Sequence, residues 1–443
     1  MSRGDEARER WKGLFAGFAA GREGSDPAEW TRRRAAAMAS FEEQGLPTTR
    51  WEEWRYTSLA GIEKTGFRLA RADVDLDRAQ LEPLCVPVFA CSLVVFVNGR
   101  FAPGLSAPGS GGPELTSLAA ELRERPDETL ALLAAVDAGD WKGHPFAALN
   151  DAFVEDGAVL RLPRDRRIET PIHLVFVSTG DDAPGVQHPR VLVDAGPGSE
   201  ATVIQDHVSI GDGVHLTNAF TQLRLGPNSK LDLVVLQREN DDTFHVSQCR
   251  AVQERDSRLA CHTISLGGAL VRNDLSARLE GEGAECTLRG LYVGHGDQVI
   301  DNHTWVDHAV PHCRSDELYK GVLGGAARGV FRGRVIVRPG AQKTDALQSN
   351  PNLLLSDRAE MDTKPQLEIH ADDVKCSHGS TIGQIDPDAL FYLRSRGLPE
   401  ESARDLLTAG FAAEITEGLP AESLGDRVRE LLMVHLGRAG VST

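Results

Sequence analysis

The sequence of 443 residues lacks the features that mark membrane-spanning, secreted or nucleic-acid-binding proteins. Its longest apolar run, Val88 to Val97, is about half of the ~20 residues that a membrane span requires. Charged residues occupy the N-terminus, where a signal peptide needs an apolar stretch. The formal net charge of −17 opposes binding to a nucleic-acid backbone or an anionic membrane. We therefore expect a cytoplasmic protein whose partners are neither nucleic acid nor membrane.

Cysteines are few, and none has the spacing of a zinc or redox motif. The seven are scattered, odd in number and without a C-x-x-C pair: Cys85, Cys91, Cys249, Cys261, Cys286, Cys313 and Cys376. This pattern indicates reduced thiols in a reducing compartment, and small buried core positions are the commonest role of such residues.

The sequence also lacks the strong catalytic signatures. It contains no Walker A pattern, no G-x-S-x-G elbow, no H-E-x-x-H pair and no G-x-G-x-x-G fingerprint. A self-contained ATPase, serine hydrolase, zinc protease or dinucleotide enzyme is therefore not expected.

What the sequence does contain is a recurring turn signal among short alternating apolar runs. The turns begin at Gly196, Gly226, Glu254 and Gly281, and a strand pattern follows each of them. A spacing of just under thirty residues, made of strands and turns, is typical of a solenoid in which each coil buries its apolar face against the next. We predict a mostly β protein, with a parallel β-helix core over residues 161–384.

Helical patterns flank this core on both sides. Residues 1–160 are rich in alanine, glutamate and arginine and contain helix starts such as Asp26-Pro27, which predicts a mainly helical N-terminal domain. After residue 384, Asp386-Pro387 begins a helical pattern, and further helices are expected over Pro399 to Glu417 and Pro420 to Leu436. Residues 385–443 are thus expected to form a C-terminal helical domain.

Cys376 and His378 form the best candidate pair of metal ligands. In an extended strand their side chains point to the same face, roughly 7 Å apart along the chain. Two ligands cannot fill a tetrahedral metal site or hold a cluster, so the others would come from elsewhere or from another chain. The alternative is a core cysteine beside a hydrogen-bonded surface histidine.

A rival interpretation is a β-helix enzyme that acts on carbohydrate, of the lyase or esterase type. Asp301, His303, Trp305 and Asp307 alternate onto one strand face, where they could form a cluster of carboxylates and a basic group. We favour the alternative that these four residues form a solvated or interface face.

Several motifs toward the C-terminus resemble the SufB/SufD family of iron–sulfur cluster assembly proteins. They are Glu317-Leu-Tyr-Lys-Gly, Ala327-Arg-Gly-Val-Phe-Arg-Gly, Ala341-Gln-Lys-Thr-Asp, Thr363-Lys-Pro-Gln-Leu-Glu-Ile, Ala371-Asp-Asp-Val-Lys-Cys-Ser-His-Gly and Phe391-Tyr-Leu-Arg-Ser-Arg-Gly. Leu46-Pro47, Trp54-Arg-Tyr-Thr57 and Phe146-Ala-Ala-Leu-Asn150 extend the resemblance into the N-terminal region.

The resemblance implies a scaffold subunit that is not itself an enzyme. Such a subunit pairs with a SufB-like paralogue through the β-helix and binds a SufC-like ATPase through its C-terminal helices. A transient iron–sulfur cluster or iron is handled at the interface, where the histidine that matches His378 is implicated. SufB carries a cysteine and a glutamate for sulfur handling that the segment from Cys376 to Gly383 does not reproduce, so we do not expect the primary sulfur acceptor. A reduced flavin is linked to the family's complex, but no pattern here predicts a flavin site.

Overall fold

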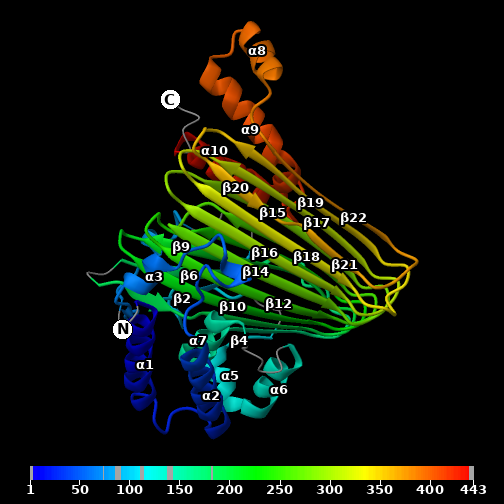
Figure 1. The fold of residues 1–443 in the computed structure, drawn as a ribbon. Helices are drawn as coiled ribbons and strands as arrows, with labels where there is room; N and C mark the ends of the chain where they lie inside the picture. Colours follow the sequence, from blue (N-terminus) through cyan, green and yellow to red (C-terminus); the bar gives the residue numbers. More distant parts are fainter. Residues whose placement is uncertain are drawn as a thin grey trace.

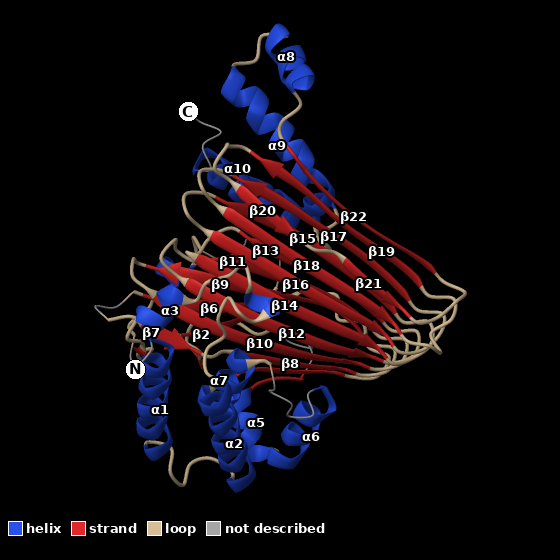
Figure 2. Cartoon of the chain, viewed as in Figure 1, coloured by secondary structure: helices blue, strands red, loops and turns tan. Residues whose placement is uncertain are grey.

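The computed structural model describes residues 3–72, 74–84, 91–109, 114–136, 143–180 and 183–438. The chain winds as a β-helix whose coils stack into two facing sheets, and helices lie at both ends of the chain (Figure 1; Figure 2). The pairing of successive coils is parallel throughout the core. The expected mostly β solenoid with flanking helices is thereby confirmed.

Each coil contributes one strand to each sheet. Sheet A consists, in spatial order, of β20 (Glu360–Thr363), β18 (Arg328–Val337), β16 (Val299–His308), β14 (Leu270–Leu279), β12 (Phe244–Gln253), β10 (His215–Leu225), β8 (Arg190–Ala195), β5 (Gly157–Leu162) and β4 (Glu114–Ser117), with β21 (Gln366–Ile369) also beside β18 and β7 (Gly185–Gln187) between β10 and β1 (Arg68–Leu69). Sheet B consists of β22 (Lys375–Gly383), β19 (Asp345–Leu354), β17 (Arg314–Leu323), β15 (Glu285–Gly294), β13 (Arg258–Ser265), β11 (Lys230–Arg238), β9 (Glu200–Ile210), β6 (Ile172–Thr179), β2 (Ser92–Val97) and β3 (Arg100–Phe101).

The turn signal found in the sequence forms the corner before the strands β9, β11, β13, β15 and β17 of sheet B. The third residue of the turn has a positive φ at five successive corners: Gly198, Asn228, Asp256, Gly283 and His312. Glycine, asparagine and aspartate enter this left-handed region at the lowest cost, which explains why they recur there. The corners also stack by hydrogen bonds, as where the N–H of Gly198 donates to the carbonyl of Pro227 (2.9 Å).

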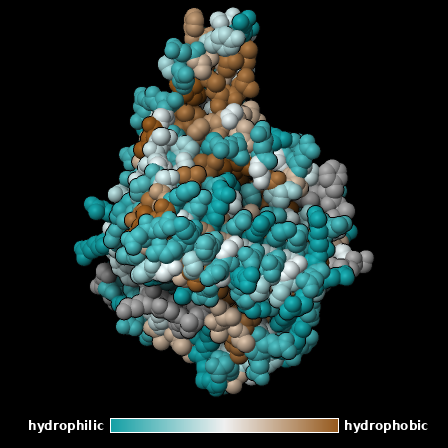
Figure 3. Space-filling view, turned by 90° about the vertical axis from the view of Figure 1, so that its right-hand side faces the viewer, coloured by the Kyte–Doolittle hydropathy of each residue, from teal (hydrophilic) through white to brown (hydrophobic). Residues whose placement is uncertain are grey.

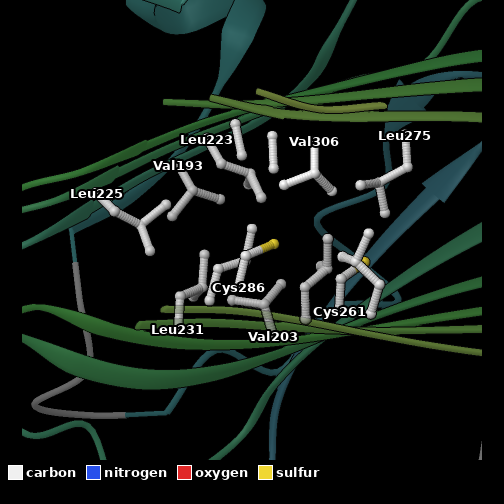
Figure 4. Close-up of a cluster of buried hydrophobic side chains, with 14 of the residues drawn as sticks. Val193, Val203, Leu223, Leu225, Leu231, Cys261, Leu275, Cys286 and Val306 are labelled. Atoms are coloured by element: carbon white, nitrogen blue, oxygen red, sulfur yellow. The ribbon is translucent and has the colours of Figure 1, made fainter. Parts of the chain in front are cut away.

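The core lies between the two sheets. Val203 and Leu231 from sheet B face Leu223 and Leu225 from sheet A (Figure 4). Among the cysteines, Cys261, Cys286 and Cys313 are buried, and Cys91, Cys249 and Cys376 are half-buried. The expectation of core cysteines holds for the three buried ones, whereas Cys85 lies outside the described residues.

Near the C-terminal end of the core, inward-facing glycines make room for large side chains. A Cβ atom at Gly290 would overlap the ring of Tyr319, and one at Gly321 would lie 2.6 Å from Cζ of Tyr292. Both tyrosines are 1% exposed. The Tyr-x-Gly spacing of the motif from Glu317 to Gly321 is therefore a packing requirement of this part of the interior.

Replacing Gly290 by alanine should lower the free energy of unfolding by about 1–3 kcal/mol, because the new methyl group would displace the buried Tyr319 ring. Urea denaturation followed by circular dichroism measures this change. Gly340→Ala is the matched control, since no atom lies within 4 Å of the added Cβ, and it should stay within about 0.5 kcal/mol of wild type. Equal stabilities of the two variants would contradict the packing argument.

Most of the N-terminal helices pack on the outer face of sheet A, whereas the one at Arg78–Leu81 packs on strands of sheet B. The N-terminal helices are α1 (Arg3–Ala20), α2 (Ala28–Gln44), α3 (Ala60–Lys64), α4 (Arg78–Leu81), α5 (Leu118–Glu124), α6 (Pro126–Val136) and α7 (Pro145–Phe153), with a short 3-10 helix at Glu52–Trp54. Trp11, Phe41 and Phe153 form an apolar cluster that extends onto Val246 of β12. Strands β2 and β5 from the same region join the sheets of the core, so the N-terminal region and the β-helix share their sheets. The domain limits at residues 160 and 384 stay a prediction.

The C-terminal helices are α8 (Pro387–Ser395), α9 (Glu400–Glu417) and α10 (Glu422–Arg438). Helices α9 and α10 bury Ile415, Leu424 and Val428 against the outer face of sheet B. Helix α8 contains no buried residue and lies at the far end of the molecule (Figure 1). In the described part of the chain, no helix is both long enough and apolar enough to cross a membrane.

Candidate functional site at the open end of the β-helix

Strand β22 forms the last edge of sheet B. It pairs with β19 on one side, and no strand of the described residues pairs with its other side. Its residues are almost all exposed. An uncovered edge of this kind presents unpaired backbone N–H and C=O groups to which another chain can add a strand.

The structure places Cys376 and His378 on the inward face of this edge. In register, Cys376 neighbours Ala346 and His378 neighbours Gln348, and both neighbours are buried in the interior. Residues paired in adjacent parallel strands point the same way, so the thiol and the imidazole face the end of the interior space. His378 is exposed only because β22 is the last strand.

The thiol of Cys376 is only partly accessible. It packs against the core, and burial raises the pKa of the thiol above its ordinary value. Because the thiolate is the form that binds metals, a bound cation would have to lower this pKa again. Elsewhere in the described ranges no group of three or more histidine, cysteine or acidic side chains could hold a metal ion. Two side chains are too few for a metal site, so the ligand role of Cys376 and His378 stays a prediction.

Polar side chains that sequence reasoning did not identify lie next to His378 in the interior. The inward column of sheet B is apolar in the early coils and polar in the last ones, in the order Val203, Leu233, Cys261, Leu288, Glu317, Gln348 and His378. Nε2 of Gln348 donates a hydrogen bond to Oε2 of Glu317 (2.6 Å). Burial raises the pKa of Glu317 to about 7. The signal in the sequence was the alternation of Glu317 with Tyr319, which marks two inward positions of one strand.

The residues of the rival carbohydrate site do share the outer face of β16, but they are held by other groups. Asp301 is buried and accepts a hydrogen bond from Thr57, while Arg272 and His303 lie 2.6 and 3.0 Å from its carboxylate. Although burial raises the pKa of Asp301, Arg272 and His303 together hold it well below its usual range. Asp307 is paired with Arg338 through two contacts of 2.8 and 3.0 Å. Neither carboxylate is available as the general acid of a lyase or esterase.

A cleft of about 300 Å³ lies beside the exposed Trp305, between the sheet and the segment around Trp54. Four arginines line it, and carboxylates engage three of them: Arg272 by Asp274 and Asp301, Arg332 by Glu52, and Arg334 by Glu368. The fourth, Arg250, lies over the ring of Phe220. The paired guanidinium groups are thus not available to the phosphates of a flavin, and no residue of this cleft is assigned to such a cofactor.

A second exposed surface lies on the C-terminal helices. Figure 3 shows apolar side chains gathered toward the top of one face, where these helices lie. The large apolar residues exposed on them are Phe391 (74%), Tyr392 (56%), Leu406 (54%), Met433 (43%) and Val434 (58%). Contiguous exposed apolar side chains commonly mark a protein-binding surface.

Comparison with known proteins agrees with the motifs over nearly the whole chain. The family model described as SUF system FeS cluster assembly, SufBD core domain, matches residues 176–411, and that of the SufBD protein N-terminal region matches residues 6–174. The iron-sulfur cluster assembly protein SufD of Escherichia coli (strain K12) is 33% identical over 427 residues, which cover 95% of each chain. An iron-sulfur cluster assembly SufBD family protein of Synechocystis is 33% identical over 420 residues, 92% of this chain and 91% of its own. The chain therefore belongs to the SufB/SufD family of iron–sulfur cluster assembly proteins, as its motifs had indicated.

Proposed function

We propose that this protein is a non-catalytic scaffold subunit of a complex that builds iron–sulfur clusters, and that it pairs with a SufB-like paralogue through the open end of its β-helix. The observation that carries the proposal is the uncovered edge of β22, with two ligand-type side chains beside it. The iron–sulfur cluster is the cargo of this scaffold and not a resident cofactor. The cytoplasmic location expected from the sequence stays a prediction.

The free edge of β22 offers a defined set of backbone groups. The N–H of Lys375 donates to the carbonyl of Thr344, so the odd-numbered residues of β22 bond to the neighbouring coil. Because the direction alternates along a strand, Cys376, His378, Ser380 and Ile382 direct their N–H and C=O groups outward. A strand from a second β-helix can continue sheet B along these four residues, which places its side chains next to Cys376 and His378.

Cys376 and His378 can then bind iron or a cluster together with ligands from the partner. Neutral imidazole and thiolate are ligands of iron and of iron–sulfur clusters, and a cluster needs about four such ligands. Cys376 and His378 together supply at most half of them, and a partner strand completes the set. Separation of the two chains would dismantle this site, which suits a scaffold that must release its cargo.

The C-terminal helices provide the second partner surface. We assign α8 and the first turns of α9 to a SufC-like ATPase, because α8 buries nothing in this chain while its Phe391 and Tyr392 are exposed. Helices α9 and α10 are fixed to sheet B by apolar contacts, so a pull on α8 is transmitted to the β-helix without unfolding it.

The pairing is tested by Ser380→Pro in this chain, co-expressed with the SufB-like paralogue. Proline removes one outward N–H from the free edge without breaking a hydrogen bond inside the chain. We expect the affinity for the paralogue to fall by at least about tenfold, which corresponds to about 1.4 kcal/mol. The wild-type pair should bury more than about 2,000 Å², as obligate pairs do.

Analytical ultracentrifugation of the purified proteins at micromolar concentration measures this affinity. Circular dichroism must show an unchanged fold of the Ser380→Pro variant. Gly340→Ala, in the corner before β19 and outside the free edge itself, serves as the control and should pair normally. A wild-type chain that stays monomeric beside the paralogue would sink the proposal, and so would a proline variant that pairs at full strength.

A further inference from the structure

The last buried side chain of the inward column, Gln348, carries a polar atom without a partner among the described residues. Gln348 is 1% exposed, and its amide oxygen Oε1 accepts no hydrogen bond in the structure. A buried acceptor without a donor costs stability, and native proteins rarely retain one without a use. The next inward side chain toward the open end is His378, which is paired with Gln348 in register.

A hydrogen bond to the preceding coil fixes the orientation of the Gln348 amide. Its Nε2 donates to Oε2 of Glu317, which is 2% exposed and one coil deeper in the same inward column. A carboxyl group keeps an acceptor oxygen for this N–H in either protonation state. Because the nitrogen end is held by Glu317, the oxygen end is left as the free acceptor of the amide.

A glycine on the opposite sheet keeps the amide in this place. A Cβ atom at Gly333 of β18 would overlap the amide group of Gln348, so the interior has space for the glutamine only because residue 333 has no side chain. The glycine that closes the motif from Ala327 to Gly333 thus has a specific purpose. It lets a long polar side chain cross the interior beneath the end strand.

We infer that Gln348 and Glu317 are positioning residues for His378. The exposed imidazole of His378 turns toward the interior, so that the amide oxygen of Gln348, which is unpaired in this structure, accepts the N–H of one ring nitrogen. This bond selects one tautomer and leaves the other nitrogen free to bind a metal. This inference rests on the proposed ligand role of His378. Metal-binding histidines commonly donate their second ring N–H to a carbonyl or carboxylate, which sets the tautomer and the ring orientation.

The tautomer of His378 can be read directly in the full-length protein. We expect the two ring nitrogens of His378 to show well-separated ¹⁵N shifts, one protonated and one not, in protein labelled with ¹⁵N-histidine. The spectrum of His378→Ala identifies the resonances. In Gln348→Met, which keeps the length of the side chain but removes the acceptor, the two shifts should move toward the averaged values of a mixed tautomer.

Two further variants guard against a simple loss of packing. Glu317→Gln is isosteric and makes the amide orientation of Gln348 ambiguous, so it should also mix the tautomers while the fold is kept. Leu347→Ala lies on the same strand but on the outer face, where the side chain is 48% exposed, and it should leave the shifts unchanged. Unchanged His378 shifts in both Gln348→Met and Glu317→Gln, or a mixed tautomer already in the wild type, would overturn the inference.

A second measurement tests whether the positioning of His378 by Gln348 affects metal binding. In the complex with the SufB-like paralogue, Gln348→Met should weaken the binding of Co²⁺, used as a probe for Fe²⁺, by about 10- to 100-fold. The failures of the two proposals are distinguishable. If His378→Ala binds Co²⁺ as well as the wild type, the ligand role is wrong, whereas the tautomer shifts still decide whether Gln348 positions the ring.

Discussion

Replacing His378 by alanine should reduce cluster formation in the reconstituted complex to a small fraction of the wild-type yield. The imidazole lies at the open end of the interior, exposed in the isolated chain and beside the edge that a partner strand would cover. Its loss removes the proposed ligand but few packing contacts, so the free energy of unfolding should change by only ~0.5 kcal/mol. The site would lose function while the subunit keeps its fold and its partners.

The yield is measured as iron and acid-labile sulfide bound per complex after anaerobic reconstitution. His370→Ala is the matched control, since this histidine is also exposed in the last coil but follows β21 in sheet A. The control should assemble clusters at the wild-type level. A normal yield from the His378→Ala complex would remove this histidine from the mechanism and leave the open end as a purely architectural surface.

The triple substitution Phe391→Ser, Tyr392→Ser and Leu406→Ser should abolish co-purification of the SufC-like ATPase. These side chains are 74%, 56% and 54% exposed, so serine should leave the isolated chain nearly as stable as before. Large apolar side chains at the centre of an interface commonly contribute 2 kcal/mol or more each, and loss of three would weaken binding by about four orders of magnitude.

Affinity purification of the tagged chain from cells that express all three subunits provides the measurement. The SufB-like paralogue should still co-purify, because the free edge of β22 is untouched. Leu347→Ser, an exposed apolar residue on the outer face of β19, is the control and should retain the ATPase. Recovery of the ATPase with the triple variant at the wild-type ratio would contradict the assignment of α8 and α9.

Point substitutions separate binding of the ATPase from binding of the SufB-like paralogue more cleanly than deletion of residues 399–443. The deletion would remove α9 and α10 entirely, whose Ile415 and Val428 cover Ile264 and Leu291 on the outer face of sheet B. Several apolar side chains of the sheet would become exposed, and the truncated chain would be prone to aggregate. Loss of both partners from such a truncation would reflect damage to the β-helix itself.

Local chemistry determined much of this protein from the sequence alone. The period of the coils could be predicted because the residues that tolerate a left-handed conformation, such as Asn228 and Asp256, recur at each corner. The common face of Cys376 and His378 followed from the alternation of a strand. The motifs were sufficient to indicate the family, since they combine these local requirements with packing demands such as Gly321 against Tyr292.

Only the tertiary structure decided which side chains from different coils are neighbours. Gln348 and Glu317 are 31 residues apart and meet because one coil stacks on another, and Asp301 is engaged by Thr57 from 244 residues earlier. A strand pattern shows that two side chains share a face, but it does not show which face is inside. The inward direction of His378, and the polar column beneath it, depend on the register between coils. That register is set by long-range packing of the whole β-helix, for which no single segment carries a signal.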